Sequence, residues 1–256
     1  MNLKFITTVL FILAYTIAGY CQEPKLIKKK ELLQDGKAIY TVLKDNPAVK
    51  HGDYIVNAYS GNKKLVSGRY NKGQKEGFWT ERFYGLGSRE IKSYGEYRND
   101  SKTGTWIYYS FDGDTSQVFD HTNQKLIYAK NYHSDTSKYE IKTDTGSFKS
   151  RLDAPPLYIG GYDILFTIVM DSLGSFPQAL NTKKTDIFKI HTDLIYTVDK
   201  DSKVTDIKFS EKIGYGYEER LTELIKATSG NWIPGKLNNS KVNVQLKIPL
   251  RMAYQF

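Results

Sequence analysis

The side chains best suited to chemistry are few and widely separated in this sequence. Histidine is a common metal ligand and general base, but no two histidines stand at the spacing of a metal site. The four histidines are His51, His121, His133 and His191. The single cysteine, Cys21, lies at the end of an apolar N-terminal run. Because no nucleophile, base and orienting residue form a set, we expect no catalytic residue, no metal centre and no cofactor.

Short motifs with a calcium-binding or phosphate-binding mechanism are incomplete. The segment Asp112-Gly113-Asp114-Thr115 matches part of a calcium loop but lacks the glutamate that would complete the ligand set. The pairs Gly85-x-Gly87 and Gly214-x-Gly216 lack the third glycine and the strand-to-helix context of a dinucleotide site. The sequence therefore predicts a protein that is not an enzyme.

The charge pattern bears on the class of partner. The chain of 256 residues carries 37 basic and 28 acidic side chains, a net charge of +9. These charges are interspersed rather than gathered into the dense basic patch of a nucleic-acid-binding protein. We expect a solvated surface and no nucleic-acid partner.

The segment best suited to binding is a strand near the C-terminal end of the sequence. Apolar residues alternate with polar ones from Lys241 to Leu250, which predicts a strand with one buried face. Pro249 cannot donate a ladder hydrogen bond, so it favours an edge position. A free edge can capture an extended peptide through backbone hydrogen bonds. The predicted partner-binding residues are Lys241, Val242, Asn243, Val244, Gln245, Leu246 and Lys247. The alternative is an ordinary edge strand, guarded against pairing by its lysines.

The first 22 residues have the pattern of a secretory signal. Lys4 precedes an apolar run from Phe5 to Ile17, and small residues follow it. The run is shorter than the roughly 20 residues of a membrane span, so we expect export and a periplasmic or cell-envelope location. An uncleaved inner-membrane anchor and a lipoprotein modified at Cys21 are the alternatives. The charged segment 23–35 that follows is expected to be a flexible leader.

An internal repeat occupies residues 36–133. Gly68-Arg69-Tyr70 aligns with Gly95-Glu96-Tyr97, and Gly77-Phe78-Trp79 aligns with Gly104-Thr105-Trp106, in each case 27 residues apart. Asn-Lys-Gly and Asn-Asp-Ser between the aligned segments are turn sequences, so each unit is predicted to be a β-hairpin. The repeated aromatic residues are expected to pack between hairpins rather than to stack on a ligand.

The repeat resembles the bacterial variant of the MORN-repeat family, in which an aromatic strand, an Asn-Gly-like turn and Gly-x-Trp recur. Two copies match well, and two flanking copies match weakly. The resemblance implies a scaffold or an interaction surface rather than catalysis.

Residues 134–154 are assigned to a connecting segment in which Tyr139–Ile141 and Ser147–Lys149 could form short strands. A boundary is predicted at Asp153-Ala154-Pro155-Pro156. Residues 155–256 then form a C-terminal domain whose order is helix, strand, strand, helix, strand. Its helices are predicted near 163–174 and 217–228, each with one apolar face.

The C-terminal domain resembles that of TonB-type energy transducers. The resemblance lies in Tyr158-Ile159-Gly160-Gly161, Phe176-Pro177-x-Ala179, Asp199-Lys200-Asp201-Ser202-Lys203-Val204, Trp232-Ile233-Pro234-Gly235-Lys236 and Ile248-Pro249-Leu250. It implies that the last strand binds a segment of a TonB-dependent outer-membrane receptor and that the chain is linked to transmembrane transport. A homodimer is a further arrangement it leaves open. The chain departs from the family at Ser202, where a turn glycine is usual, and its seven prolines do not form a long Pro-rich spacer.

Together these patterns predict an α+β protein. We expect an N-terminal antiparallel β-hairpin repeat sheet and a C-terminal domain with a three-stranded antiparallel sheet and two helices. The expected function is non-enzymatic capture of an extended partner peptide by strand addition. The alternative is a structural scaffold that works through the repeat sheet.

Overall fold

The structure of the chain is a computed structural model that describes residues 23–59, 63–84, 90–130, 137–174, 187–214 and 216–255. The predicted signal segment 1–22, His133, the Gly85-x-Gly87 pair and the Phe176-Pro177-x-Ala179 motif lie outside these residues. No helix in the described ranges is long and apolar enough to cross a membrane.

The α+β prediction is wrong, because the protein is mostly β. Strands make up 58% of the described residues and helices only 11%. The two predicted helices are present, but they are short. Most of the described residues belong to a nine-stranded and a six-stranded sheet. The error arose from counting too few strands: the segments before and after the repeat, which lack strong alternation, also form strands.

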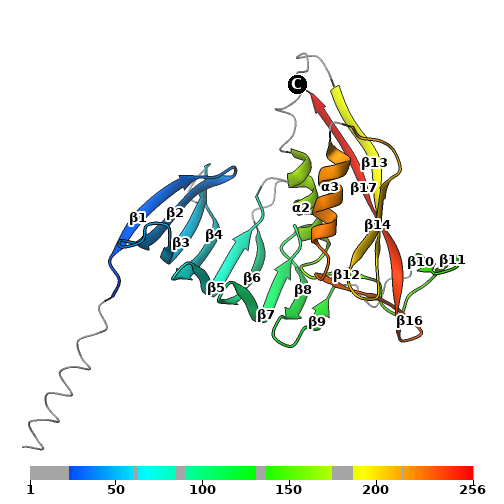
Figure 1. Ribbon diagram of the computed structural model, residues 1–256, viewed down its shortest axis with the longest axis horizontal. Coiled ribbons are helices and arrows are strands. Elements are labelled where there is room, and N and C mark those ends of the chain that lie inside the picture. Colours follow the sequence, from blue (N-terminus) through cyan, green and yellow to red (C-terminus); the bar gives the residue numbers. More distant parts are fainter. Residues whose placement is uncertain are drawn as a thin grey trace, which may run out of the picture. The chain divides into compact units, whose positions relative to one another are not determined.

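The first sheet is a nine-stranded meander in which each strand pairs with its neighbours in sequence (Figure 1). Its strands are β1 (Leu26–Leu32), β2 (Gly36–Leu43), β3 (Lys50–Ala58), β4 (Lys64–Asn71), β5 (Gln74–Arg82), β6 (Ile91–Arg98), β7 (Ser101–Tyr109), β8 (Thr115–Asp120) and β9 (Lys125–Ala129). The predicted hairpin turns are confirmed: Lys72 and Gly73 have φ of 46° and 92°, and Asn99 and Asp100 have φ of 50° and 64°. Positive φ at both central residues suits tight turns between twisted strands.

The chain divides into two compact units, which are described separately. One unit runs up to Trp79 and includes Tyr97–Ser101. The other contains Thr80–Glu96 and Lys102–Phe256. The boundary predicted at Pro155 therefore does not separate the last repeat strands from the C-terminal residues.

The predicted flexible leader is partly wrong, because it contains strand β1. Leu26 pairs with Leu43 and Leu32 pairs with Lys37 across β2. All seven residues of β1 are exposed. Backbone pairing with β2 rather than side-chain burial therefore holds this strand, which explains why its sequence shows no buried face.

The 27-residue period has a steric cause in the packing of glycine under tryptophan. A Cβ atom on Gly68 would lie 2.1 Å from the Trp79 ring, and one on Gly95 would lie 2.3 Å from the Trp106 ring. Each indole therefore lies directly on the backbone of the neighbouring strand. Trp79 is 1% exposed and Trp106 is 0% exposed. The prediction that these aromatic residues pack within the sheet is confirmed.

A lysine accompanies each tryptophan at the same period. The Lys75 ammonium lies 4.5 Å from the Trp79 ring centre and 4.7 Å from that of Tyr97. The Lys102 ammonium lies 4.2 Å from the Trp106 ring centre. Cation–π contacts of this kind stabilise a partly covered aromatic face. The two lysines therefore lie over the rings of the two repeated tryptophans.

The second sheet has six strands in the order β11, β10, β17, β13, β14, with β16 also paired to β17. These strands are β10 (Tyr139–Thr143), β11 (Gly146–Ser150), β13 (Ile187–Val198), β14 (Val204–Phe209), β16 (Gly235–Leu237) and β17 (Ser240–Gln255). A separate pair joins β12 (Leu157–Tyr158) to β15 (Trp232–Ile233). The prediction of three strands is therefore wrong for this sheet. The short strands considered at 139–141 and 147–149 are real, and they belong to the sheet rather than to a connector.

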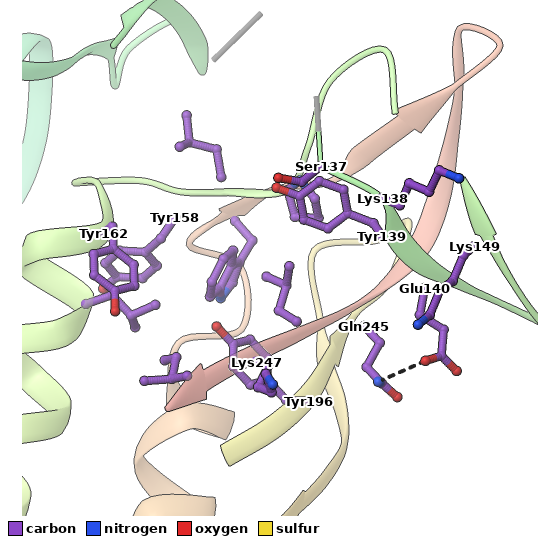
Figure 2. A pocket seen from close by; sticks show the side chains of 16 residues that line it. Ser137, Lys138, Tyr139, Glu140, Lys149, Tyr158, Tyr162, Tyr196, Gln245 and Lys247 are labelled. Atoms are coloured by element: carbon purple, nitrogen blue, oxygen red, sulfur yellow. Dashed lines mark hydrogen bonds between the residues drawn. The ribbon is translucent and has the colours of Figure 1, made fainter. Parts of the chain in front are cut away.

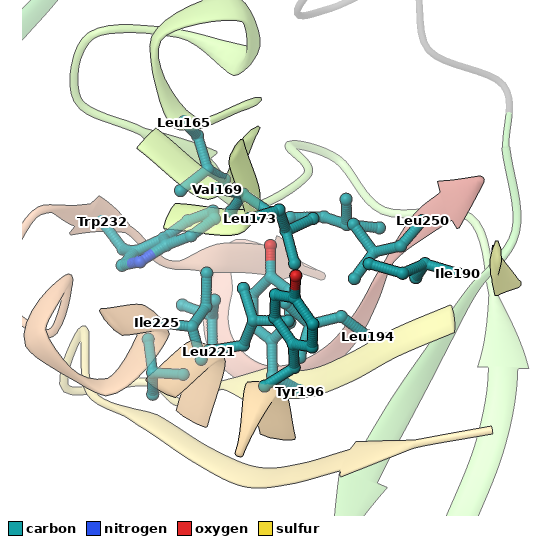
Figure 3. Packing of buried hydrophobic residues seen from close by; sticks show 14 residues of the cluster. Leu165, Val169, Leu173, Ile190, Leu194, Tyr196, Leu221, Ile225, Trp232 and Leu250 are labelled. Carbon is teal, nitrogen blue, oxygen red and sulfur yellow. The ribbon is translucent and has the colours of Figure 1, made fainter. Parts of the chain in front are cut away.

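Helices α2 (Tyr162–Gly174) and α3 (Tyr217–Ala227) pack against this sheet (Figure 1). Their apolar faces meet inward-facing residues of β13 and β17 in one core (Figure 3). The fully or nearly fully buried members include Leu165, Val169, Leu173, Leu194, Tyr196, Leu221, Ile225, Ile248 and Leu250. The predicted apolar faces of both helices are therefore confirmed. Burial of each large side chain contributes about 1.5–3 kcal/mol.

Strand β8 is joined to the start of α2 by polar contacts within the second unit. The Gln117 amide donates to the Tyr158 carbonyl at 3.1 Å and accepts the Gly160 N–H at 2.5 Å. Gln117 is fully buried, so both bonds lie away from water. The Asp163 carboxylate accepts the Phe111 N–H at 2.9 Å. The last repeat strands therefore brace the segment that leads into α2.

Candidate functional site

Strand β17 is the centre of the second sheet, with pairing on both sides along part of its length. From Val244 to Gln255 it pairs with β13. On the other side Asn243, Val244 and Gln245 pair with Lys142, Ile141 and Glu140 of β10. Further back, Lys241 and Val242 pair with β16.

The predicted free edge from Lys241 to Lys247 is therefore wrong over most of its length. Lys241 and Val242 belong to the hairpin with β16, and Asn243–Gln245 are covered by β10. The Asn243 side chain also accepts the Lys200 N–H at 2.9 Å. Only Leu246 and Lys247 of the predicted residues have β13 as their one partner strand in the described part of the chain. The sequence correctly indicated a well-formed strand, but it did not reveal that β10 covers it.

Beyond Gln245, no described strand pairs with β17 on the side of β10. From Leu246 to Leu250, β17 pairs with β13 alone among the described strands, and we name this segment the open edge. Pro249 lies within it and has no N–H to donate. Backbone groups on an open edge are available to another extended chain. The residues from Leu246 to Ile248, which precede the proline, all have a backbone N–H, so no donor is missing from this part of the open edge.

A groove with a volume of about 630 Å³ lies along this segment. Such a volume is in the usual range of ligand sites, about 300–1,000 Å³. Its wall is formed by residues of β10, β11, β12, α2, β13, β15 and β17 and of the segments next to β10 and β12. These residues are Ser137, Lys138, Tyr139, Glu140, Lys149, Pro156, Leu157, Tyr158, Tyr162, Leu165, Tyr196, Trp232, Gln245, Leu246, Lys247 and Ile248.

The floor of the groove is apolar and aromatic. Leu165, Trp232 and Ile248 are each under 5% exposed, so they form its deep part. Tyr158 packs edge-on against Trp232 with ring centres 5.3 Å apart. Figure 2 shows Tyr158 and Tyr162 on the side of the groove near α2. Trp232 is held in place by a bond from its indole N–H to the Thr228 hydroxyl at 2.9 Å.

The groove tyrosines are neutral groups. Burial raises the pKa of Tyr158, and burial together with the Asp163 charge raises the pKa of Tyr162. The pKa of Tyr196 is also raised, chiefly by burial. These residues therefore offer rings and hydroxyl hydrogen bonds, but no charge, to a ligand.

The opposite end of the groove is charged. Figure 2 shows Lys138, Glu140 and Lys149 there, with the Gln245 amide hydrogen-bonded to Glu140 at 3.3 Å. Glu140 also accepts from Lys142 at 2.6 Å and from Ser147 at 2.8 Å. The bond from Lys142, followed by that from Ser147, lowers the pKa of Glu140, so its carboxylate is ionised at neutral pH.

A second polar cluster lies in the repeat sheet, away from the groove. The Tyr108 hydroxyl is 2.7 Å from Nε2 of His121 and accepts from Lys102 at 3.2 Å. Burial, and then the Lys102 charge, lowers the pKa of His121 to about 4. His121 is therefore neutral at physiological pH, and its Nε2 atom shares a hydrogen bond with the Tyr108 hydroxyl. In the described residues no three His, Cys, Asp or Glu side chains are placed to hold a metal ion.

Sequence reasoning missed most of the groove. Tyr139 and the two lysines near it fell in the assumed connector, and Tyr158 was noted only as part of a motif. Their proximity depends on the pairing of β10 with β17 and of β12 with β15, which local periodicity does not specify. The alternation of Tyr139 and Ile141 within a short strand was the one available signal.

Comparisons of the chain with known protein families, with curated proteins and with solved structures found no match. The geometry of β17 and its groove is therefore the basis for assigning a function.

Proposed function

We propose that this protein is a non-enzymatic cell-envelope protein that captures an extended peptide by strand addition to the open edge of β17. The observation that carries the proposal is the coincidence of unpaired backbone at Leu246–Ile248 with the adjoining groove. Strand addition draws affinity from main-chain hydrogen bonds and specificity from pockets for alternate side chains. Both elements occur together here.

The position of β10 supports this site. Glu140, the second residue of β10, pairs with Gln245 in antiparallel register, so a peptide placed alongside Leu246–Ile248 would lie next to the N-terminal end of β10. The peptide would extend an existing sheet rather than begin a new one. Such an added strand needs no rearrangement of β13, which lies on the other side of β17.

The class of partner follows from the motifs of the C-terminal region. Their resemblance to TonB-type transducers, together with the signal-like N-terminus, favours a periplasm-facing segment of an outer-membrane receptor. A role in transmembrane transport belongs to the same proposal.

The test is a titration of the full chain, without its signal segment, with extended seven-residue peptides from the periplasmic ends of such receptors. Backbone NMR shifts and hydrogen exchange would be followed. We expect protection at Leu246–Ile248 and no change on β14 (Val204–Phe209), the opposite edge of the same sheet. Shifts confined to the repeat sheet would reject strand addition to β17.

The alternative, a scaffold working through the repeat sheet, is favoured by one observation. β1 is a fully exposed edge strand, and Leu32 on it is 73% exposed. Replacing Leu32 and Ile27 by threonine tests this surface. The strand-addition proposal expects peptide affinity to stay unchanged, whereas the scaffold proposal expects partner binding to fall.

A further inference from the structure

Three lysines border the groove, and we name them the lysine rim: Lys138, Lys149 and Lys247. Lys138 and Lys149 are exposed, and neither forms an ion pair with a described residue. Glu140 is the one carboxylate among the described lining residues. The groove therefore carries a net positive charge.

Glu140 offsets only part of the charge of the lysine rim: the Lys149 charge acts on it, but as the last of the causes that lower its pKa. Its oxygens accept from Lys142, Ser147 and Gln245, none of which belongs to the rim. Lys247 forms an ion pair with Oδ2 of Asp193 at 3.1 Å, while Arg251 binds the other oxygen, Oδ1, at 2.7 Å. The Lys247 side chain is 59% exposed, whereas that of Asp193 is 16% exposed. The ion-paired Lys247 ammonium therefore still faces solvent and can contact a second acidic group.

The residues of the open edge alternate in chemistry. Leu246 and Ile248 face the apolar core and the groove floor, and Lys247 between them is exposed. Side chains directly opposite each other in neighbouring strands interact, and opposite charges stabilise the pair. A peptide added here would place apolar side chains opposite Leu246 and Ile248 and one side chain opposite Lys247.

Two of the chain's own edge strands, β1 and β11, are poor occupants in a second copy because they are basic. β1 carries Lys28, Lys29 and Lys30, and β11 carries Lys149. Either strand would bring ammonium groups against the lysine rim, and like charges placed opposite one another are destabilising.

We infer that the groove selects a peptide in which an acidic residue stands between two apolar residues, with a further acid toward Lys138. The inference rests on the proposed strand addition and specifies its partner. The acidic side chain pairs with Lys247, and the apolar side chain nearest Trp232 enters the aromatic floor.

The experiment uses a fluorescent peptide, Ser-Val-Glu-Leu-Glu-Ser, and the full chain without its signal segment. Three variant peptides are compared with it. One has both Glu replaced by Gln, one has Leu replaced by Ser, and one is N-methylated on alternate amides. Lys247→Gln is the test variant, and Lys208→Gln on the exposed far strand β14 is its charge-matched control. Circular dichroism verifies that both variants fold.

We expect the Gln and Ser peptides to bind about 5- to 30-fold more weakly, in line with exposed charge pairs and partly buried apolar contacts. Lys247→Gln should weaken binding of the Glu peptide about fivefold, leave the Gln peptide unchanged, and reduce the salt dependence. Lys208→Gln should change neither affinity.

The N-methylated peptide separates the two proposals. Binding that is lost on N-methylation but is equal for Glu and Gln peptides would overturn the acidic selectivity and leave strand addition standing. Binding indifferent to N-methylation, or absent for every peptide, would overturn strand addition and the selectivity with it. A dimer protected at Leu246–Ile248 would assign the groove to a second copy and likewise overturn the inference.

Discussion

Replacement of Gly95 by alanine should destabilise the second unit through a single defined clash. The added Cβ would lie 2.3 Å from the Trp106 ring, and ordinary contacts begin near 3.4 Å. Trp106 is fully buried, and its indole N–H donates to the Glu96 carbonyl at 3.0 Å, so the ring cannot move without losing that bond. Gly95 does not have a positive φ, so strain in the backbone is not part of the effect.

The expected loss in the free energy of unfolding is that of an overpacked core site. Overpacked sites lose about 1–3 kcal/mol, and the weakened indole bond adds about 1 kcal/mol. We therefore expect Gly95→Ala to lower the free energy of unfolding by about 2–4 kcal/mol. Urea unfolding followed by tryptophan fluorescence measures this, and Thr105→Ala at an exposed position of β7 serves as control.

A double-mutant cycle decides whether the clash is the cause. In a Trp106→Leu background the ring is absent, so Gly95→Ala should be neutral or stabilising by up to about 1 kcal/mol, as alanine restricts the unfolded chain. Additive losses in the double variant would refute the steric explanation of the 27-residue period.

Three further outcomes are expected. The unfolded chain protonates His121 near pH 6.5 and the folded chain only near pH 4, so the free energy of unfolding should fall as pH drops through this window. For this half-buried ring the loss should be about 1–2 kcal/mol after solvent screening; urea unfolding of His121→Gln, which should lose this dependence, checks it. Lys102→Met removes the nearby charge and should raise the pKa of His121 in an NMR titration; an unchanged pKa would contradict the role of Lys102. Gln117→Leu leaves buried backbone groups of Tyr158 and Gly160 unpaired and should lose about 2–4 kcal/mol in denaturant unfolding and also weaken peptide binding, whereas a loss under 1 kcal/mol would show that these groups find other partners.

The elements that could be predicted from sequence are those that local patterns determine. The turns at Asn71–Gly73 and Asn99–Asp100 contain residues with positive φ, and Asn, Asp and Gly are the residue types that adopt it most readily. The apolar faces of α2 and α3 repeat at helical spacing and are buried as expected. The packing role of Trp79 and Trp106 followed from their regular period.

The neighbours of each strand could not be predicted in the same way. β1 is exposed on both faces, so no alternation marks it, and β10 is too short to show its partner. The period-two pattern of β17 specifies which face is buried, but it does not specify which strands lie at its two edges. The position of the open edge depends on those neighbouring strands, so the sequence-based prediction placed a free edge at Lys241–Lys247 instead of at Leu246–Leu250.

The central place of β17 also has a consequence for how the chain folds. Glu140 of β10 pairs with Gln245, and Ile190 of β13 pairs with Met252. The β10–β11 and β13–β14 hairpins therefore both pair with β17, which follows them in the sequence. Before β17 has paired, no strand connects the β10–β11 hairpin to the β13–β14 hairpin in this sheet. Such non-local pairing slows folding and leaves edges exposed meanwhile. Truncation before Ser240 would therefore leave two disconnected hairpins prone to aggregation, rather than a smaller version of the same sheet.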